Sequence, residues 1–322
     1  MLMARLHGDH GVTTIRKGDS MAFRLTGLIA AAFTAFDDDG TLNLEPVAAH
    51  SALLARNGVS GVFVCGTTGE GVSMTTDERM RCLERWHAER GVLKVIAHVG
   101  HNSIGDARAL AAHAEKVGVD ALSTVGPSLL RPAAIEDLVD WCASVASAAP
   151  STPYYYYHIP ILTGLRFDMH RFLRLASTRI PTFAGLKFTD ENLLEFSRCV
   201  DFEGGRYNML WGRDEILLAG LAAGAHGAIG STYNYSAPVY RRVIEAFERG
   251  DMTAAANEMR LVRDSIQVLV DFGGLPAGKA MLALCDVDCG TVRLPLRTLS
   301  PDRVDALRAA LFNIDWERVR CT

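Results

Sequence analysis

The chain has 322 residues, of which 49% are hydrophobic and 22% are charged, a composition typical of a folded protein with one large domain or two of ordinary size. Its formal net charge is −4, and its Lys and Arg residues are scattered along the sequence rather than clustered. Because binding to a polyanion needs a concentrated basic surface, we expect no nucleic-acid partner.

The N-terminal region differs from the rest of the chain. Residues 1–22 are polar, show no helical or strand periodicity and include a second methionine, Met21. We predict a disordered leader there. The apolar stretch that follows, residues 25–36, is short for a membrane span and runs directly into the acidic turn sequence DDDG. It predicts a buried first strand and no membrane anchor.

From residue 28 onward, short apolar runs alternate with longer segments of helical period. The predicted strands are residues 28–36, 61–66, 95–100, 120–126, 154–159, 183–188, 208–212 and 227–231. Many of the helical segments end on glycine, and Thr75 with Glu78 forms a capping-box pattern before the second one. Alternating strands and helices force parallel strands with right-handed crossovers. Eight such units predict an α/β fold, a closed (β/α)8 TIM barrel.

The barrel is expected to occupy residues 23–250. Residues 251–322 contain further helical patterns without strands, which predict a C-terminal helical tail packed on the barrel. The seven cysteines are an odd number, widely spaced and mostly set in apolar runs, as in a reduced cytoplasmic protein. Cys285 and Cys289 lie close together, but no matching Cys or His pair accompanies them, so we expect no metal site.

Polar residues follow several predicted strands, where barrel enzymes carry their functional side chains. They are Gly66, Thr67, Thr68, Gly69 and Glu70 after the second strand, Tyr157 and His158 at the end of the fifth, Lys187 and Thr189 on and after the sixth, Gly212, Arg213, Asp214 and Glu215 after the seventh, and Ser231 after the eighth. We take this end of the predicted barrel as the candidate site.

Strand periodicity sorts the run YYYYHIP, which begins at Tyr154. Tyr155 and Tyr157 share one face of the strand, and Gly185 and Lys187 share one face of the next. If that face is the lumen, a phenol and an amine meet at the barrel mouth. Partial burial favours an uncharged amine, which can form a Schiff base with a ketone. The alternative is a lysine that extends to solvent, and the spacing does not decide between them.

Two further groups have a functional and a structural interpretation. The sequence GTTGE, residues 66–70, offers glycines and hydroxyls that suit a carboxylate, but it also suits a tight strand-to-helix turn. Asp214 and Glu215 can accept hydrogen bonds from a polyol, or serve the N-terminus of the next helix. His158 faces away from Tyr157 and is predicted to be a scaffold residue. No role is assigned to His98, His101 or His226.

Four motifs in order, GTTGE, Y-H-I-P, G-L-K-F and G-S-T-Y-N, resemble the N-acetylneuraminate lyase and dihydrodipicolinate synthase family of class I aldolases, over about residues 26–315. The sialic acid lyase branch is most similar. The resemblance implies that Lys187 forms an imine, that Tyr157 relays a proton and that Thr67 and Thr68 hold the pyruvate carboxylate. It assigns the sugar to Thr189, Gly212, Asp214, Glu215 and Ser231. It also implies a homotetramer and no cofactor beyond the lysine.

Two positions bear on the choice of branch. Synthases of the family usually carry an arginine where this chain has Leu162, so a clamp for a second carboxylate is missing. Many members also have a tyrosine, lent by a neighbouring subunit, where this chain reads Ser128, Leu129 and Leu130. The rival hypotheses are an aldolase or dehydratase for a 2-keto-3-deoxy sugar acid, a dihydrodipicolinate synthase, and a non-catalytic sugar-acid sensor.

Overall fold

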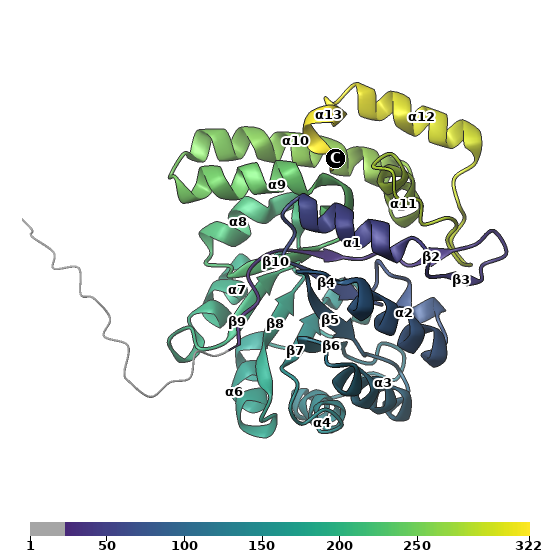
Figure 1. The fold of residues 1–322 in the computed structure, drawn as a ribbon. Helices are drawn as coiled ribbons and strands as arrows, with labels where there is room; N and C mark the ends of the chain where they lie inside the picture. Colours follow the sequence, from purple (N-terminus) through teal and green to yellow (C-terminus); the bar gives the residue numbers. More distant parts are fainter. Residues whose placement is uncertain (1–22) are drawn as a thin grey trace, which may run out of the picture.

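The computed structural model describes residues 23–322, so the leader predicted for residues 1–22 lies outside the described residues. The barrel strands are β1 (Gly27–Ala31), β4 (Gly61–Val64), β5 (Lys94–His98), β6 (Ala121–Val125), β7 (Tyr154–His158), β8 (Phe183–Phe188), β9 (Asn208–Trp211) and β10 (Gly227–Gly230). They are parallel, each pairs with its neighbour in chain order, and β10 pairs with β1 to close the barrel. The predicted (β/α)8 barrel is confirmed (Figure 1).

Each barrel strand is followed by one or two helices, and these helices surround the barrel (Figure 1). They are α1 (Val47–Arg56), α2 (Thr76–Glu89), α3 (Ile104–Val117), α4 (Ile135–Ala146), the short α5 (Pro160–Thr163), α6 (Met169–Arg179), α7 (Leu193–Val200), α8 (Leu217–Ala222) and α9 (Tyr233–Glu248). The capping box predicted before α2 is present, because Thr75 and Glu78 each accept a hydrogen bond from the other's backbone N–H. This cap fixes where the helix starts relative to the loop that precedes it.

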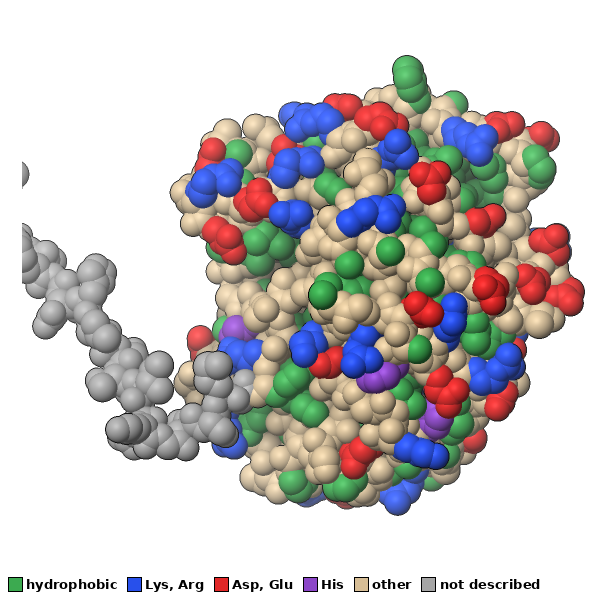
Figure 2. Space-filling view, viewed as in Figure 1, with side chains coloured by type: hydrophobic (Ala, Val, Ile, Leu, Met, Phe, Trp, Pro, Cys, Tyr) green, Lys and Arg blue, Asp and Glu red, His purple; other side chains and the backbone are tan. Residues whose placement is uncertain are grey.

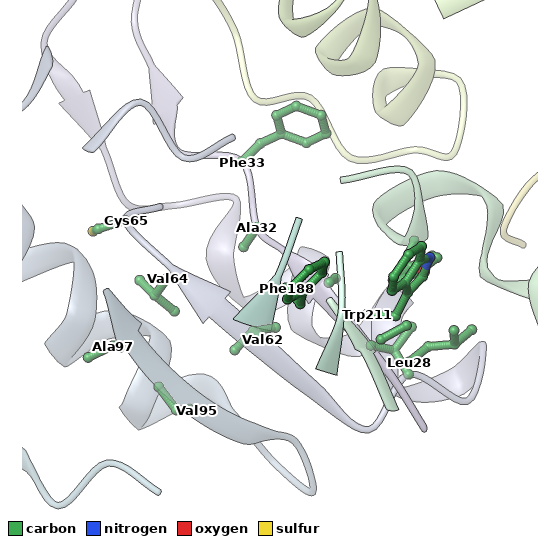
Figure 3. Packing of buried hydrophobic residues seen from close by; sticks show 14 of the residues in the cluster. Leu28, Ala32, Phe33, Val62, Val64, Cys65, Val95, Ala97, Phe188 and Trp211 are labelled. Atoms are coloured by element: carbon green, nitrogen blue, oxygen red, sulfur yellow. The ribbon is translucent and has the colours of Figure 1, made fainter. Parts of the chain in front are cut away.

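Alternation along the strands sorts the buried side chains into two clusters. The cluster in the barrel lumen includes Ile29, Phe63, Ile96, Tyr155, Tyr157, Leu210 and Ile229. Tyr154 and Tyr156 belong to the larger cluster between strands and helices. Figure 3 shows part of that outer cluster, in which the rings of Phe188 and Trp211 stack with centroids 6.2 Å apart. The predicted division of the four tyrosines between two faces is therefore confirmed.

The first predicted strand, residues 28–36, is wrong in extent. The barrel strand ends at Ala31, and β2 (Ala35–Phe36) pairs antiparallel with β3 (Leu42–Asn43) in a separate hairpin. Gly40 adopts a φ of 82° in the acidic turn that joins the two strands. The apolar residues of the sequence continue beyond the barrel strand because Phe36 packs against the tail, where it forms a parallel β-bridge with Gly290.

The tail consists of α10 (Met252–Asp271), α11 (Leu275–Ala283), α12 (Pro301–Phe312) and α13 (Trp316–Val319). Figure 1 shows α10 lying along α9, with α12 and α13 stacked outside it and the loop after α11 descending to the β2–β3 hairpin. The end of the chain returns to the barrel, because the Thr322 carbonyl accepts hydrogen bonds from Arg56 and Asn57 at 2.7 and 2.9 Å. The tail thus packs on the barrel at several separate points.

The remaining general predictions concern cysteines and charge. All seven cysteines are buried and unpaired, as expected for reduced core residues. On the face shown in Figure 2, basic and acidic side chains are mixed, without a field of one sign. Among residues 23–322, no helix is both long and apolar enough to cross a bilayer.

Candidate active site

Lys187 and Tyr157 meet in the barrel lumen. They are register partners on the neighbouring strands β8 and β7, and each is 4% exposed. The Lys187 Nζ lies 3.9 Å from the centroid of the Tyr157 ring and 4.2 Å from that of Phe63. The lysine therefore points inward rather than to solvent, and two aromatic faces are placed to stabilise a positive charge at Nζ.

His98 stands beside this pair, although its sequence context gave it no role. Its ring centroid lies 6.1 Å from that of Tyr157 in an edge-to-face arrangement. Nδ1 lies 3.1 Å from the Cys65 carbonyl oxygen, and Nε2 is 3.3 Å from the backbone N of Val125. Nδ1 therefore donates, Nε2 accepts, and the imidazole is neutral. Burial, followed by the positive charges of Arg79 and Lys187, holds the pKa of His98 well below its usual value.

The sequence did contain a signal for His98. It lies two residues after Ile96 on β5, and that side chain belongs to the lumen cluster, so strand alternation also directs His98 inward. His98 lacks metal-ligand spacing to other histidines, so the signal for its place in the lumen is the parity of its position on the strand. Within the part of the chain that the structure describes, no group of His, Cys, Asp and Glu side chains is arranged to hold a metal ion.

The GTTGE loop, residues 66–70, forms a tight turn directly after β4. Gly71 N donates to the Gly66 carbonyl at 3.0 Å, and the Thr34 hydroxyl donates to the Gly69 carbonyl at 2.7 Å. A Cβ on Gly71 would lie 2.0 Å from the Cys65 carbonyl oxygen, so this position requires glycine. Thr67 is exposed and Thr68 half-buried at the mouth of the barrel. The loop is thus a tight turn that also leaves its hydroxyls accessible.

Asp214 is the buried acid of the site. Its Oδ2 accepts hydrogen bonds from the Thr232 backbone N at 3.1 Å and from the Thr232 hydroxyl at 2.7 Å, whereas Oδ1 has no partner among the described residues. Burial raises the pKa of Asp214 to about 6, against the opposing effect of these hydrogen bonds. The Tyr233 hydroxyl is also buried without a partner in the described chain, and the nearby Asp214 charge adds to the burial that raises the pKa of this phenol.

Thr189 and Gly212 lie next to each other at the ends of β8 and β9. A Cβ on Gly212 would lie 1.9 Å from the Thr189 hydroxyl oxygen, so glycine leaves room for that hydroxyl. In the described part of the chain, this buried oxygen has no hydrogen-bond partner. Together with Asp214 Oδ1 it forms a set of unmet polar atoms, which are costly to bury unless a ligand satisfies them.

The other predicted site residues lie at the edge of this set. Ser231 is partly buried directly after β10. Glu215 is partly exposed and forms an ion pair with Arg213 at 3.0 Å, which favours a role in holding the loop after β9. At the position of the second tyrosine that many family members carry, Leu129 and Leu130 are 81% and 86% exposed. The structure thus brings Lys187 and Tyr157 into contact, whereas Glu215 is paired with Arg213.

This chain is similar to known proteins over most of its length. Residues 24–314 match the pattern of the dihydrodipicolinate synthetase family. The N-acetylneuraminate lyase of Xenopus tropicalis is 41% identical over 298 residues, which cover 91% of this chain and 97% of that protein. The structure of Proteus mirabilis N-acetylneuraminate lyase superposes with a TM-score of 0.88 at 42% identity, covering 90% of this chain and 99% of that chain. A catalytic lysine mutant of the Ruminococcus gnavus sialic acid aldolase superposes with a TM-score of 0.85 at 26% identity, covering 91% and 98%.

Proposed function

Since this chain belongs to the dihydrodipicolinate synthetase family, we propose that it is an aldolase that cleaves N-acetylneuraminate reversibly to N-acetylmannosamine and pyruvate through an imine on Lys187. The observation that carries this proposal is the contact between the Lys187 amine and the Tyr157 ring inside the lumen. The relatives named as N-acetylneuraminate lyases support the substrate. The similarity to the Ruminococcus gnavus sialic acid aldolase, which has a catalytic lysine, supports the chemistry.

The proposed reaction begins with the open-chain sugar acid. The Lys187 amine adds to the C2 ketone, and loss of water leaves a protonated imine. Tyr157 relays the proton of the C4 hydroxyl, accepting it as its own phenolic proton passes to water. The C3–C4 bond breaks, and its electron pair passes into the imine to give an enamine while N-acetylmannosamine departs. Protonation of the enamine at C3 and hydrolysis of the imine release pyruvate and restore the amine. Class I aldolases of this family need no external cofactor, because the lysine itself provides the electron sink.

Other side chains bind the two halves of the substrate in this proposal. Thr67 and Thr68 donate hydrogen bonds to the carboxylate next to the ketone. Asp214 Oδ1 and the Thr189 hydroxyl, both buried without partners in the described chain, bind hydroxyl groups of the sugar. Gly212 and Ser231 border the same space, and Glu215 completes its rim. A polyol satisfies these atoms, which supports a sugar acid as the substrate.

The same residues disfavour a synthase that takes a second carboxylate. The position that would hold the arginine clamp is Leu162, whose side chain is 54% exposed. The buried Asp214 carboxylate would repel a dicarboxylate brought near it. Cleavage assays should therefore release pyruvate faster from N-acetylneuraminate than from 2-keto-3-deoxygluconate. Preference for the latter would transfer the proposal to another pyruvate-dependent aldolase of the same chemistry.

Borohydride trapping tests the covalent step. The chain is incubated with pyruvate, reduced with sodium borohydride, digested and analysed by mass spectrometry. We expect the mass of one reduced pyruvyl group on the peptide that contains Lys187, and no such mass in Lys187→Arg, because a guanidinium does not form the imine. Modification of another lysine, or of none, would refute the proposed mechanism.

The proposal extends to the assembly and the location of the enzyme. Family resemblance predicts a homotetramer, and the reduced cysteines are consistent with the cytoplasm. Light scattering of the purified chain measures the subunit number. A division of the chain at residue 250 into barrel and tail remains a prediction, which limited proteolysis can examine.

A further inference from the structure

Glu70, the last residue of the GTTGE loop, forms an ion pair with Lys279 of α11. The Lys279 Nζ lies 2.9 Å from Glu70 Oε1, and each side chain is 3% exposed, which makes this the most buried ion pair among residues 23–322. The charge at this end of the loop is therefore paired with a charge of the tail. Burial lowers the pKa of Lys279, while the Glu70 charge opposes that change.

A second tail residue binds the same loop. The backbone N of Arg293 donates to Glu70 Oε2 at 2.9 Å, so both carboxylate oxygens contact the tail. The Arg293 guanidinium donates to both carboxylate oxygens of Glu78 at 2.8 and 2.5 Å, and to the Ser73 carbonyl at 2.9 Å. These bonds to Arg293 lower the pKa of Glu78 to about 2. One short tail segment thus fixes both the end of the loop and the start of α2.

The conformation of Glu70 depends on these contacts. Its φ is 53°, in the left-handed region that residues other than glycine rarely adopt without outside support. The other end of the loop is held at Cys65, whose carbonyl oxygen lies 3.1 Å from His98 Nδ1. Between these two fixed ends lie Thr67 and Thr68, so the position of their hydroxyls follows from how the ends are held.

From this arrangement, and resting on the function proposed above, we infer that Lys279 and Arg293 of the tail are positioning residues for pyruvate, acting through Glu70 on the carboxylate-binding GTTGE loop. They do not touch the substrate. They keep the Thr67 and Thr68 hydroxyls where the carboxylate needs them. The C-terminal tail is then part of the catalytic unit, although the residues proposed for chemistry all lie in the barrel.

Two effects of removing the pair must be separated. Changing one partner leaves an uncompensated buried charge and lowers the free energy of unfolding, whereas replacing both with neutral residues of similar size is often tolerated. The double variant therefore separates the stability of the fold from the positioning of the GTTGE loop. Glu70→Gln with Lys279→Met should recover the melting temperature that each single change loses, but the loop remains without its charged anchor.

The experiment measures pyruvate and sugar binding separately in the full-length chain. The pyruvate concentration for half-maximal borohydride trapping is compared with the apparent KM for N-acetylmannosamine in the synthetic direction. In the double variant we expect the pyruvate value to rise roughly tenfold or more, because displacement of a positioning group by a fraction of an ångström weakens a bound geometry strongly. The sugar value should stay within about twofold of the wild type.

A second, less buried ion pair between the barrel and the tail provides the control. Arg242 on α9 and Glu258 on α10 lie 2.9 Å apart and do not contact the GTTGE loop. The variant Arg242→Met with Glu258→Gln removes one basic and one acidic group, also ends the ion pair of Glu258 with Arg318, and should leave pyruvate trapping unchanged. An equal rise in both double variants would show a general effect of loosening the tail and would overturn the inference.

The outcomes also distinguish this inference from the proposed function. A wild-type chain that traps no pyruvate contradicts the proposed function and this inference with it. The inference is overturned, and the proposed function kept, if the wild type traps pyruvate normally and the folded double variant needs a similar pyruvate concentration. Similar here means a concentration for half-maximal trapping within about twofold of the wild-type value. If the double variant does not fold, Arg293→Met is judged by the same criterion, because its partner Glu78 is less buried than Glu70 and the backbone N–H at position 293 still donates to Glu70.

Discussion

At Tyr157, one side chain performs two tasks through different atoms. The face of its ring lies 3.9 Å from the Lys187 Nζ, which favours the positive charge of the amine and equally that of a protonated imine. Its hydroxyl is the group proposed to exchange a proton with the substrate. The edge-to-face contacts with Phe63 and His98 hold the ring in place, at centroid distances of 5.7 and 6.1 Å. A substitution that keeps the ring and removes the hydroxyl separates the two tasks.

The first prediction follows from that separation. In Tyr157→Phe, imine formation with pyruvate should persist, while kcat for N-acetylneuraminate cleavage falls by about 10²- to 10⁴-fold, the usual contribution of general acid–base catalysis. Steady-state kinetics and borohydride trapping on the same preparation provide both measurements. A kcat within about tenfold of the wild type would show that another group relays the proton.

At the level of strands and helices, β8 places the lysine, and its spacing from β9 depends on Gly185. A Cβ at this position would lie 1.9 Å from the Asn208 carbonyl oxygen on β9. Asn208 also accepts a hydrogen bond from the Tyr155 hydroxyl at 2.8 Å and binds the Leu25 backbone, so this contact closes the lower end of the lumen. Widening the gap between β8 and β9 would displace Lys187, two residues further along the strand.

The second prediction is therefore that Gly185→Ala lowers the free energy of unfolding by about 1–3 kcal/mol, or more if the strands cannot separate. It should also reduce pyruvate trapping at Lys187. Urea denaturation and trapping measure the two effects. Gly105→Ala is the control, because Gly105 lies in the first turn of α3 with only the Ser103 hydroxyl within 4 Å, at 3.7 Å, and should be neutral or slightly stabilising. Equal stability of Gly185→Ala and wild type would contradict this account of β8.

Strand alternation also explains which parts of the site could be predicted from sequence. The inward direction of Tyr157 and Lys187 follows from a local period of two residues, which the sequence displays. The hairpin of β2 and β3 could not be predicted in this way, because the apolar character of Phe36 reflects packing under Gly290 from the tail. The place of His98 in the lumen could have been predicted from the same two-residue alternation along a strand that identified Tyr157.

For the whole molecule, the contacts that could not be predicted are those between distant segments. Lys279 and Glu70 are far apart in the sequence, and no local pattern around either residue indicates the other. Asp214 presents a similar case, because its burial depends on Thr232 and on the packing of β10 against β9. The sequence alone indicated which residue types form the site and at which end of the barrel they lie. The burial of these residues and the pairing of their charges could be seen only in the closed barrel.

The burial of Asp214 has a consequence for the stability of the folded chain. Its pKa is raised from 3.8 to about 6, so between these values the folded state holds a proton that the unfolded state has lost. Stability from this group therefore falls as the pH rises through that window, and the cost is fully present above about pH 6. A shift of about two pKa units corresponds to roughly 3 kcal/mol, which is an upper bound for one group.

The third prediction uses Asp214→Asn, which removes the ionisation and keeps an acceptor for Thr232. The free energy of unfolding of the variant, taken relative to that of the wild type, should be higher at about pH 8 than at about pH 4, by up to roughly 3 kcal/mol. The reason is that only the wild type buries a charged carboxylate at the higher pH. Urea denaturation at both pH values, at one protein concentration, measures this change, and the comparison cancels every titrating group that the two proteins share. At the same time the variant should bind the sugar less well, since an uncharged amide is a weaker acceptor for hydroxyls. A difference in stability that stays constant with pH would show that burying the ionised Asp214 side chain has no cost, and would contradict the raised pKa of this group.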